Sequence, residues 1–456
     1  MSVNTDIQMA ELIARMAAKK GGRAYYVGGF VRDRLLGLEN KDIDVEVHGI
    51  SPRELEQILD SIGERVTIGQ SFGVYALKGC ELDIAMPRRE RQRGAGHRDF
   101  DIIVDPFLGA EKAAKRRDFT VNAMMQDVLS GEVLDFFGGM DDLSARILRH
   151  VSDESFAEDA LRVLRGAQFA ARFAFEMAPE TVELCRNMTL GALARERVEA
   201  ELKKALLKAA KPSIFFRLLR EMNRLDEWFQ EVSALIGVEQ NPRFHAEGDV
   251  WEHTMLVLDA AAKVRDKTEN PYAFMLASLA HDFGKPAATR ETDGILHAYG
   301  HESAGVNAAR EFFARLGCAN KTADYALPLI ENHMRPNILA HAKAGIKATN
   351  KMFDSVPDPA ALIYLALSDR EGQRCEEAPE ASDAFLFERL EIYREYMARP
   401  FVSGKDLVQA GLTPGENFSD ILAYAHKLRL SGIEKQSALK QTLAYAKSRG
   451  NNETRP

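Results

Sequence analysis

The sequence feature that most constrains this chain is the segment 25–47, YYVGGFVRDRLLGLENKDIDVEV. Its first three residues are apolar and β-prone, they stop at Gly28 and Gly29, and a helix start follows at once. Paired glycines ahead of a helix let backbone N–H groups approach a bound phosphate closely. The segment therefore predicts a strand, a phosphate-binding glycine turn, a short helix and a second strand. The alternative is a glycine turn without a ligand.

The second strand of this segment carries Asp42 and Asp44. Side chains two residues apart in a strand lie on the same face, which places Ile43 and Val45 on the opposite face. Two neighbouring carboxylates repel each other, and a divalent cation between them removes that repulsion. Together with the glycine turn, the pair predicts metal-assisted phosphoryl or nucleotidyl transfer. An acidic edge strand exposed to water is the alternative.

A third carboxylate, Asp83, lies in the β-prone run 81–86. Leu82, Ile84 and Met86 alternate with less apolar residues, so Asp83 lies on the less apolar face of this strand. If the strand joins the same sheet, Asp83 converges with the acidic pair and completes a two-metal site.

Length and composition predict a multidomain globular protein. The 456 residues are 46% hydrophobic and 28% charged, enough for about three domains with ample core. No apolar run approaches the length of a membrane span and the N-terminus lacks a signal-peptide pattern, so we expect a cytoplasmic protein. The net charge of −8 gives no general affinity for nucleic acid, so an RNA-binding surface requires a local basic patch, such as 88–98 or 112–117.

Strand and helix signals alternate up to about residue 144, and almost all later segments have helical periodicity. Within the first part, we expect a polar loop over 89–106 and one long helix over 107–129. The S-x-x-E sequence at 155–158 has the form of a capping box and predicts that the next helix begins there. The fold class is therefore predicted to be α+β, with a mixed α/β N-terminal part and helical domains after it.

Six motifs resemble, in order, those of the class II tRNA nucleotidyltransferase and poly(A) polymerase family. They are GGFVRD (28–33), DID (42–44), RRDFTVNAM (116–124), DFFGGMDDL (135–143), EDALRVLR (158–165) and RERVEAEL (195–202). Together they are far more specific than any one of them. The resemblance implies a nucleotidyltransferase palm that adds C and A nucleotides to the 3′ end of tRNA without a template.

The resemblance also implies a role for each polar residue of the palm. Asp42 and Asp44 would hold Mg²⁺. Asp83 is the third carboxylate, because the family places one five residues before an arginine and Arg88 follows Asp83 by five. The expected nucleotide contacts are the triphosphate for Gly28, Gly29 and Arg32, a phosphate or sugar for Arg117, and ribose hydroxyls or the supporting loop for Asp118 and Asn122.

Asp159, Arg162 and Arg165 lie three residues apart in EDALRVLR. A carboxylate accepts a hydrogen bond from an exocyclic amine, and a guanidinium donates to ring acceptors. Cytosine and adenine both present an amine beside an acceptor, whereas uracil and guanine present a carbonyl at that place. The resemblance implies that Asp159 and Arg162 select C and A and that Arg165 supports the base or phosphate. A row of surface salt bridges is the alternative.

Seven of the eleven histidines lie between residues 245 and 341, and this part of the chain resembles an HD-domain phosphohydrolase. The H…HD…D pattern of metal ligands is matched by His253, His281, Asp282 and Asp369. His301 and His333 are candidates for supporting groups or for ligands of a second metal. Imidazoles and carboxylates suit a divalent cation that activates water for phosphoester hydrolysis. The alternative is a degenerate HD fold with structural histidines.

We therefore predict four regions: a nucleotidyltransferase palm (1–150), a helical nucleobase- and RNA-binding region (151–240), an HD domain (241–400) and a helical tail (401–456). The predicted activity is CCA addition to tRNA from CTP and ATP, with phosphoester hydrolysis by the HD domain. Three alternatives stay open: a CC-only, A-only or poly(A)-adding relative, an RNA-end phosphohydrolase whose palm only positions RNA, and a non-catalytic RNA-binding protein. The sequence does not predict an oligomeric state.

Overall fold

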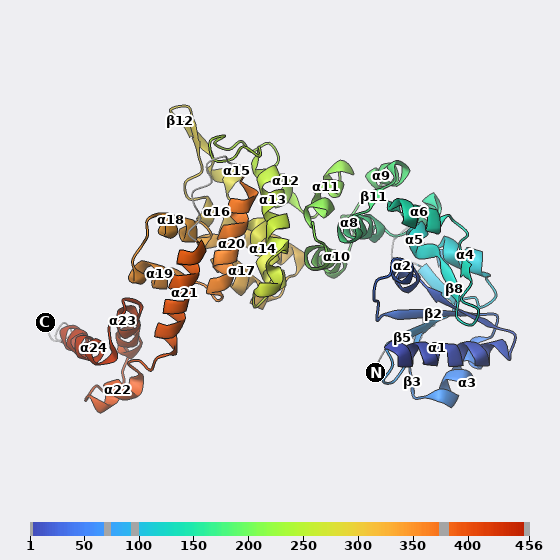
Figure 1. The fold of residues 1–456 in the computed structure, drawn as a ribbon, viewed down its shortest axis with the longest axis horizontal. Helices are drawn as coiled ribbons and strands as arrows, with labels where there is room; N and C mark the ends of the chain where they lie inside the picture. Colours follow the sequence, from blue (N-terminus) through green and yellow to red (C-terminus); the bar gives the residue numbers. More distant parts are fainter. Residues whose placement is uncertain (1–2, 68–73, 93–99, 374–382, 451–456) are drawn as a thin grey trace. The chain divides into compact units, whose positions relative to one another are not determined.

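The computed structural model describes residues 3–67, 74–92, 100–373 and 383–450. The chain forms two compact units, residues 1–201 with 214–224 and residues 202–213 with 225–456. The predicted α+β class is confirmed, because a mixed sheet lies in the first unit and helices dominate the rest of the chain (Figure 1). Of the helices that the structure describes, none combines the length and the apolar character needed to cross a bilayer.

A seven-stranded sheet organises the first unit. In sheet order its strands are β3 (Arg65–Thr67), β4 (Val74–Leu77), β5 (Leu82–Ala85), β2 (Ile43–His48), β1 (Arg23–Val27), β8 (Met125–Asp127) and β9 (Val133–Leu134). The β2–β5 pair is parallel, and the other neighbouring pairs are antiparallel. The two predicted acid-bearing strands are therefore direct neighbours in the centre of the sheet.

Helices lie on both sides of this sheet. Figure 1 shows α1 (Val3–Ala18) and α3 (Pro52–Ile62) on one side of β2 and α2 (Gly29–Leu35) on the other. Ile43, Val45 and Val47 of β2 are buried, because alternate side chains of a strand share one face and here that face is the apolar one. The acidic face of the same strand is left for the site.

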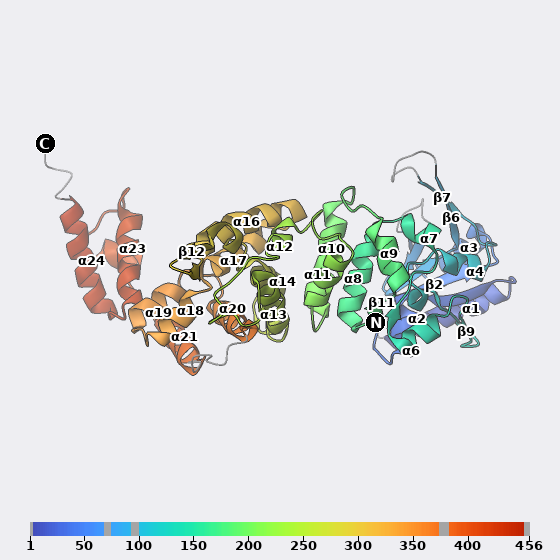
Figure 2. The ribbon, with the colours of Figure 1, turned by 90° about the horizontal axis from the view of Figure 1, so that it is seen from above.

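The polar loop predicted over 89–106 is wrong. β6 (Arg88–Gln92) and β7 (Phe100–Val104) pair antiparallel as a separate two-stranded sheet (Figure 2). The β-branched residues of the run 100–104 favour a strand, and pairing extends that preference to the charged run 88–92. Residues 93–99, which include much of the basic segment 88–98, lie outside the described residues.

The single helix predicted over 107–129 is also wrong. α4 (Ala110–Lys115) and α5 (Thr120–Ala123) are separated by Phe119, whose backbone is extended (φ −124°, ψ 149°), and β8 follows. The ring of Phe119 is fully buried against Phe156 and Phe169. Tertiary packing of this ring outweighs the helical propensity of its neighbours.

The helix start predicted at Ser155 lies three residues too late. Ser152 is the N-cap of α7 (Asp153–Ala157), and its hydroxyl accepts a hydrogen bond from the Ser155 backbone N–H. The hydroxyl of Ser155 instead donates a hydrogen bond to the carbonyl oxygen of Lys115. Helical structure continues with α8 (Leu161–Phe173), α9 (Pro179–Arg186), α10 (Arg195–Lys208) and α11 (Ser213–Glu221).

Smaller elements complete the first unit. They are α6 (Gly139–Ala145) and the parallel pair of β10 (Ile147–Leu148) and β11 (Glu176–Met177).

The second unit is a bundle of helices around a buried central helix. Its principal members are α13 (Val250–Ala262), α14 (Pro271–Ala280), α16 (His301–Leu316), α17 (Asn320–Asn332) and α20 (Pro359–Gly372). α14 packs against α13, α17 and α20, and nine of its ten residues are buried. The histidine-rich site is built at the ends of these helices.

The remaining elements surround this bundle or follow it in the chain. They are α12 (Gln230–Ser233), the 3₁₀ helix η1 (Arg265–Lys267), α15 (Lys285–Ala288), β12 (Arg290–Thr292), β13 (Ile295–His297), α18 (Arg335–His341), α19 (Ile346–Phe353), α21 (Asp383–Ala398), α22 (Gly404–Gln409), α23 (Phe418–Leu430) and α24 (Lys435–Gly450). β12 and β13 form an antiparallel hairpin.

Candidate functional sites

The acidic site of the first unit is built by the parallel pairing of β2 and β5. In this register Asp44 lies opposite Asp83, and Ile43 lies opposite Leu82 on the buried face. Asp42 is exposed and lies one residue before β2. The sheet thus brings Asp83 beside the acidic pair, as the alternation of residues along both strands predicts.

The charges of this site favour a bound cation. Burial, opposed by Arg117 and reinforced by Asp83 and Asp42, raises the pKa of Asp44 to about 6. A raised carboxyl pKa next to other carboxylates reflects both lost hydration and mutual repulsion. Mg²⁺ prefers oxygen ligands and is usually bound by one or two carboxylates plus substrate phosphates. The three aspartates fit such a cation.

Asp44 and Asp83 line a cavity that also contains four arginines. They are Arg88, Arg116, Arg117 and Arg162. Arginine guanidiniums bind phosphate oxygens, while carboxylates bind the accompanying cation. The cavity therefore suits a polyphosphate that carries a metal ion.

The glycine turn adjoins this cavity. Gly28 has a φ of 67°, and a Cβ atom at this position would lie 3.0 Å from the Arg117 guanidinium and 3.5 Å from the Asp44 carboxylate. The left-handed backbone conformation therefore favours glycine at this position, beside the two side chains.

Arg32, predicted to bind the triphosphate, is only 3% exposed and is absent from the described lining of this cavity. Its guanidinium donates to Asp33 and, at 2.6 Å, to Asn122. It also stacks on the rings of Phe169 and Phe173. Arg32 thus links α2, the helix after the glycine turn, to α5 and α8.

Asp118 joins Asn122 and Arg165 in a buried network. Asn122 donates to Asp118 Oδ1 at 3.0 Å, and Arg165 Nε and Nη2 lie 2.8 and 2.7 Å from Oδ2. Burial would raise the pKa of Asp118, but Arg165 and Asn122 hold it below its ordinary value. These contacts favour the bracing role over ribose binding for Asp118 and Asn122.

The two predicted base-selecting residues have separate partners. Asp159 Oδ2 accepts a hydrogen bond from Arg197 Nη2 at 2.7 Å. Arg162 donates to the carbonyl oxygens of Arg116, at 2.7 Å, and Ser155, and it lines the acidic cavity. Arg197 belongs to RERVEAEL, so this motif contacts EDALRVLR through a residue to which sequence reasoning gave no role.

The second site lies where the helices of the second unit end. Three groups of side chains each have their ligand atoms within 4.8 Å of one another. Two of them contain the predicted ligands, and they are His253, His281 and Asp369, and Asp282, His301 and His333; the third is His245, Glu247 and His253. All six side chains of the first two groups are buried. The structure therefore brings together the four residues of the H…HD…D pattern and both additional histidines.

Gly284 allows the C-terminal end of α14 to approach α16. A Cβ atom at Gly284 would lie 1.9 Å from the carbonyl oxygen of His301, so no other residue fits. Asp282 consequently reaches the first two groups, with Oδ2 3.3 Å from His281 Nε2 and Oδ1 3.4 Å from His301 Nε2.

Main-chain contacts fix the orientation of three histidine rings. In His281, His301 and His333, Nδ1 lies 2.7–2.9 Å from a main-chain carbonyl oxygen. A carbonyl only accepts, so Nδ1–H of each ring donates to it, and Nε2 is the nitrogen that faces the cluster. His301 Nε2 lies 3.3 Å from His333 Nε2. The two Nε2 atoms are therefore close enough to bind one cation together.

The pKa values of two histidines move in opposite directions. Burial, with a contribution from His281, lowers the pKa of His333 to about 4, so this imidazole is neutral and able to bind a metal at pH 7. Burial would also lower the pKa of His253, but hydrogen bonds to Asp369 and Glu247 raise it to about 9.

Asp282 is the central carboxylate of this site. It is 1% exposed, and neither oxygen accepts a hydrogen bond of good geometry from the described residues, although Lys285 Nζ lies 2.7 Å from Oδ2. Burial would raise its pKa, but His281 and Lys285 hold it well below its ordinary value. A buried, ionised carboxylate among imidazole Nε2 atoms fits a divalent cation.

Sequence reasoning missed two residues of this site. The Glu247 carboxylate lies 2.8 Å from Nδ1 of both His253 and His245, and its side chain is 1% exposed. Lys285 donates to Gln240 Oε1 at 2.6 Å. Both lie close in sequence to predicted ligands: Glu247 is six residues before His253, and Lys285 is three residues after Asp282. This proximity is the sequence feature from which a role in the site could have been predicted.

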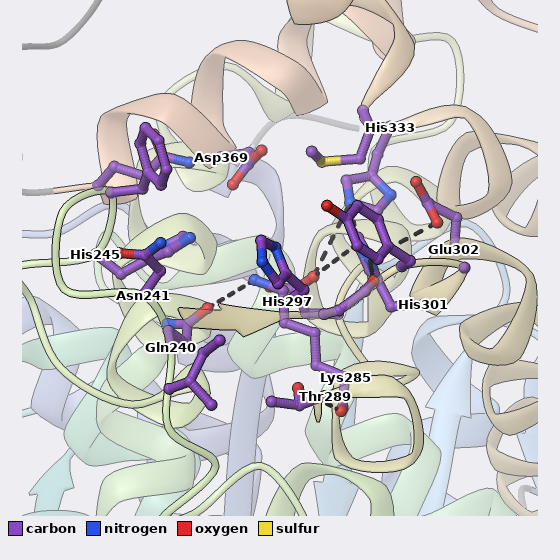
Figure 3. A pocket seen from close by; sticks show the side chains of 18 of the residues that line it. Gln240, Asn241, His245, Lys285, Thr289, His297, His301, Glu302, His333 and Asp369 are labelled. Carbon is purple, nitrogen blue, oxygen red and sulfur yellow. Dashed lines mark hydrogen bonds and ion pairs between the residues drawn. The ribbon is translucent and has the colours of Figure 1, made fainter. Parts of the chain in front are cut away.

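These residues open into a cavity of about 420 Å³. Figure 3 shows its two labelled sides, one with Gln240, Asn241 and His245 and the other with His301, Glu302 and His333. Four of the metal-binding candidates, Asp282, His301, His333 and Asp369, line this cavity and are therefore accessible to a small ligand or the end of a larger one.

The sequence of each unit matches a known domain. The poly A polymerase head domain matches residues 24–149, and the HD domain matches residues 250–372. Fold and sites together define a class of protein in which a nucleotidyltransferase head is joined to an HD domain.

Relatives that match over most of their length identify the family within this class. The multifunctional CCA protein of Pasteurella multocida is 36% identical over 403 residues, which cover 85% of this chain and 92% of the relative. That of Actinobacillus pleuropneumoniae serotype 5b is 41% identical over 326 residues, covering 70% and 77%. The chain belongs to the family of multifunctional CCA proteins.

A solved structure shows the same fold. The Thermotoga maritima CCA-adding enzyme, complexed with tRNA, has a TM-score of 0.63 and 19% identity, and the match covers 98% of this chain and 99% of that chain.

Proposed function

We propose that this protein adds C and A nucleotides to the 3′ end of tRNA, using CTP and ATP, and hydrolyses phosphoesters at its HD site. The observation that carries the first activity is the cavity in which Asp44 and Asp83 face four arginines. Family membership and the fold shared with a tRNA-bound CCA-adding enzyme support tRNA as the acceptor. The cytoplasm, where tRNA and nucleoside triphosphates are available, is the proposed compartment.

Nucleotidyl transfer is assigned to the predicted palm (1–150), with the region 151–240 binding the base and RNA. Asp42, Asp44 and Asp83 would hold Mg²⁺, which neutralises triphosphate charge and favours deprotonation of the RNA 3′-hydroxyl. Arg117 and Arg116 bind phosphate oxygens and orient the triphosphate. The 3′ oxygen then attacks the α-phosphorus, the bond to the β-phosphate oxygen breaks, and pyrophosphate leaves.

Base selection is assigned to Asp159 and Arg162. Arg162 lines the acidic cavity, where the base of a bound triphosphate would be within the reach of a guanidinium. Arg197 and two main-chain carbonyls orient the pair before a base binds. Such preorganisation is what a protein needs to select a base without a template.

Nucleotide incorporation tests this assignment. With tRNA that lacks its terminal CCA, Mg²⁺ and each labelled nucleotide in turn, we expect C and A to be added and U and G to be excluded. Asp159→Ala is expected to reduce the preference for CTP over UTP by roughly 10- to 100-fold, because one base-reading contact is worth about 1–3 kcal/mol. Sequencing of the products gives both results.

The control is Glu183→Ala, which removes an exposed carboxylate from α9 and should leave the preference unchanged. Equal incorporation of U and G by the unaltered protein would refute the role of Asp159 and Arg162. Addition of C alone, A alone or A repeatedly would establish one of the more limited activities instead.

Phosphoester hydrolysis is assigned to the predicted HD domain (241–400). His253, His281 and Asp369 would hold one divalent cation and His301 and His333 a second, with Asp282 between them. Such a centre supplies an activated water and neutralises phosphate charge. Lys285, 2.7 Å from Asp282, adds positive charge beside the same centre.

Glu247→Gln tests whether the charge of Glu247 supports the metal-binding role of His253 in the HD site. The carboxylate of Glu247 fixes Nδ1–H of His253, so that Nε2 faces the ligand group. Gln can still accept this hydrogen bond but carries no charge, and loss of the negative charge is expected to weaken divalent-cation binding by about 10- to 100-fold. Titration calorimetry of the full-length protein with Mn²⁺ measures the change, and C and A addition should stay the same.

Glu311→Gln provides the matched control, because Glu311 is exposed on α16. If Glu247→Gln and Glu311→Gln bind Mn²⁺ with the same affinity as the unaltered protein, Glu247 contributes only packing.

A further inference from the structure

Asp42 differs from the other two aspartates of the acidic site because it lies outside the paired strands. It is exposed and precedes β2, whose pairing with β5 begins at Ile43. Asp44 and Asp83, in contrast, lie opposite each other within that pairing. A carboxylate that binds a cation is most effective when its position is fixed in advance. The loop between α2 and β2 is the remaining source of a contact that fixes Asp42.

Asn40 makes such a contact from within this loop. Its Oδ1 accepts a hydrogen bond from the backbone N–H of Asp42 at 2.9 Å, and its Nδ2 donates to Asp33 Oδ2 at 2.8 Å. Over residues 37–42, Asn40 is half-buried and the other five residues are exposed. Asparagine commonly binds the backbone two residues on, but the bond to Asp33 is not part of that local pattern. Asn40 therefore joins the loop to α2.

Asp33 is a firm anchor for this connection. Its side chain is 2% exposed, and its Oδ1 accepts hydrogen bonds from Arg32 Nε at 2.8 Å and from Arg32 Nη2 at 2.5 Å. The same guanidinium donates to Asn122 of α5. Hydrogen bonds between ionised groups are stronger than those between neutral ones, so the position of Asp33 is well defined before any ligand binds.

We propose that Asn40 is a positioning residue for nucleotidyl transfer, which ties the backbone of Asp42 to Asp33 and thereby places the Asp42 carboxylate for Mg²⁺. This role rests on the proposed transfer, in which Asp42 holds the cation together with the other two aspartates. Partners that orient metal ligands typically change metal affinity by about 10- to 100-fold when they are lost. Asn40 would act on the cation only through Asp42.

The tie also runs beside the glycine turn. Asn40 Nδ2 lies 3.8 Å from the position that a Cβ atom at Gly29 would take. Asp33 is the last residue of GGFVRD, and Asn40 follows it by seven. The turn and the start of the acidic strand are therefore connected through one side chain. A triphosphate that carries a metal ion would contact both, so their fixed spacing favours a productive arrangement.

Nucleotide binding with and without Mg²⁺ tests this role without turnover. Asn40→Ala removes both hydrogen bonds. Titration calorimetry of the full-length protein with CTP, in the absence of tRNA, compares excess Mg²⁺ with EDTA. We expect Asn40→Ala to weaken CTP binding about tenfold in Mg²⁺ and less than about twofold in EDTA, where Asp42 has no cation to hold. Binding of CTP at the HD site would affect every variant alike, because Asn40 lies in the first unit.

The Mg²⁺ dependence of nucleotide addition separates positioning from a general loss of structure. In single-turnover addition of labelled CTP to tRNA that lacks its terminal CCA, Asn40→Ala should raise the Mg²⁺ concentration for half-maximal rate about tenfold. At saturating Mg²⁺ the rate should return to within about threefold of the original, since the Asp42 carboxylate is still present. Structural damage alone would lower the rate at every Mg²⁺ concentration.

Two further variants separate the contacts of Asn40. In Asn40→Ser the hydroxyl can still accept from the Asp42 N–H, but the shorter side chain has no amide to donate to Asp33. We expect this variant to behave like Asn40→Ala. Glu39→Ala is the matched control, because Glu39 is the exposed neighbour in the same loop, and it should change neither CTP binding nor the Mg²⁺ dependence.

The outcomes distinguish this role from the transfer on which it rests. Equal weakening of CTP binding in Mg²⁺ and EDTA, or no weakening in either, would overturn the role of Asn40. If Asn40→Ser matches the unaltered protein, the tie to Asp33 is overturned. If the unaltered protein adds no nucleotide, the proposed transfer fails, and the binding comparison still decides the role of Asn40. If addition proceeds with the same Mg²⁺ dependence in Asn40→Ala, the transfer stands and the role of Asn40 fails.

Discussion

Replacing Asp44 with asparagine is expected to reduce C and A addition at least about a thousandfold and to leave phosphate release by the HD site unchanged. The substitution keeps the size of the side chain but removes a charge that would hold Mg²⁺ beside Asp83 and Asp42. Metal coordination contributes several kcal/mol to the transition state, and about 1.4 kcal/mol corresponds to a factor of ten. Single-turnover addition of labelled CTP to tRNA that lacks its terminal CCA measures the effect.

Thermal unfolding distinguishes a catalytic role for Asp44 from a structural one. Burial raises the pKa of this carboxyl to about 6, so at pH 7 its ionised form is less favourable in the folded than in the unfolded protein. Asp44→Asn should therefore leave the unfolding midpoint unchanged or raise it. Asp60→Asn is the control, because Asp60 is exposed and forms a surface ion pair with Arg65. This substitution should change neither nucleotide addition nor the unfolding midpoint appreciably. Addition within tenfold of the original rate would refute the role of Asp44.

The parts of the fold that sequence predicts well are those in which one local pattern decides the structure. Within the segment 25–47, residues 42–47 alternate acidic and apolar residues along a strand, and the register of β2 with β5 then places Asp44 opposite Asp83. The local sequence pattern predicts one helix over 107–129, and this prediction fails because Phe119 packs in the core against Phe156 and interrupts the helix. No local property of residues 107–129 predicts that packing, because the residues that contact Phe119 lie dozens of positions away in the sequence.

In the candidate sites, too, local sequence predicts some features and tertiary structure decides the others. Residue type predicts ligands such as His253 and Asp369, since few other side chains bind a divalent cation. It does not predict the partners that orient them. Arg32 illustrates the limit, because its match to a phosphate-binding motif does not predict the contacts of its guanidinium with Asp33 and two phenylalanine rings. Hydrogen-bond partners depend on the tertiary arrangement, which short motifs do not encode.

Replacing Asp282 with asparagine is expected to abolish phosphate release by the HD site and to leave C and A addition unchanged. Asp282 is the one carboxylate that lies within 3.4 Å of Nε2 atoms in both of the described groups that contain the predicted ligands. An amide at this position carries no charge and coordinates a divalent cation poorly. We expect bound Mn²⁺, measured by calorimetry and by metal analysis after dialysis, to fall at least about tenfold and hydrolysis at least about a hundredfold.

Asp324→Asn is the matched control for this substitution, because Asp324 is exposed on α17 and should affect neither metal binding nor hydrolysis. The ionised Asp282 balances Lys285 and the surrounding imidazoles, so its loss leaves buried positive charge and should lower the unfolding midpoint in the absence of metal. Added Mn²⁺ stabilises the unaltered protein by binding its folded state and should raise the midpoint of Asp282→Asn much less. An equal rise in both proteins would show that Asp282 is not a ligand, whether or not hydrolysis is lost.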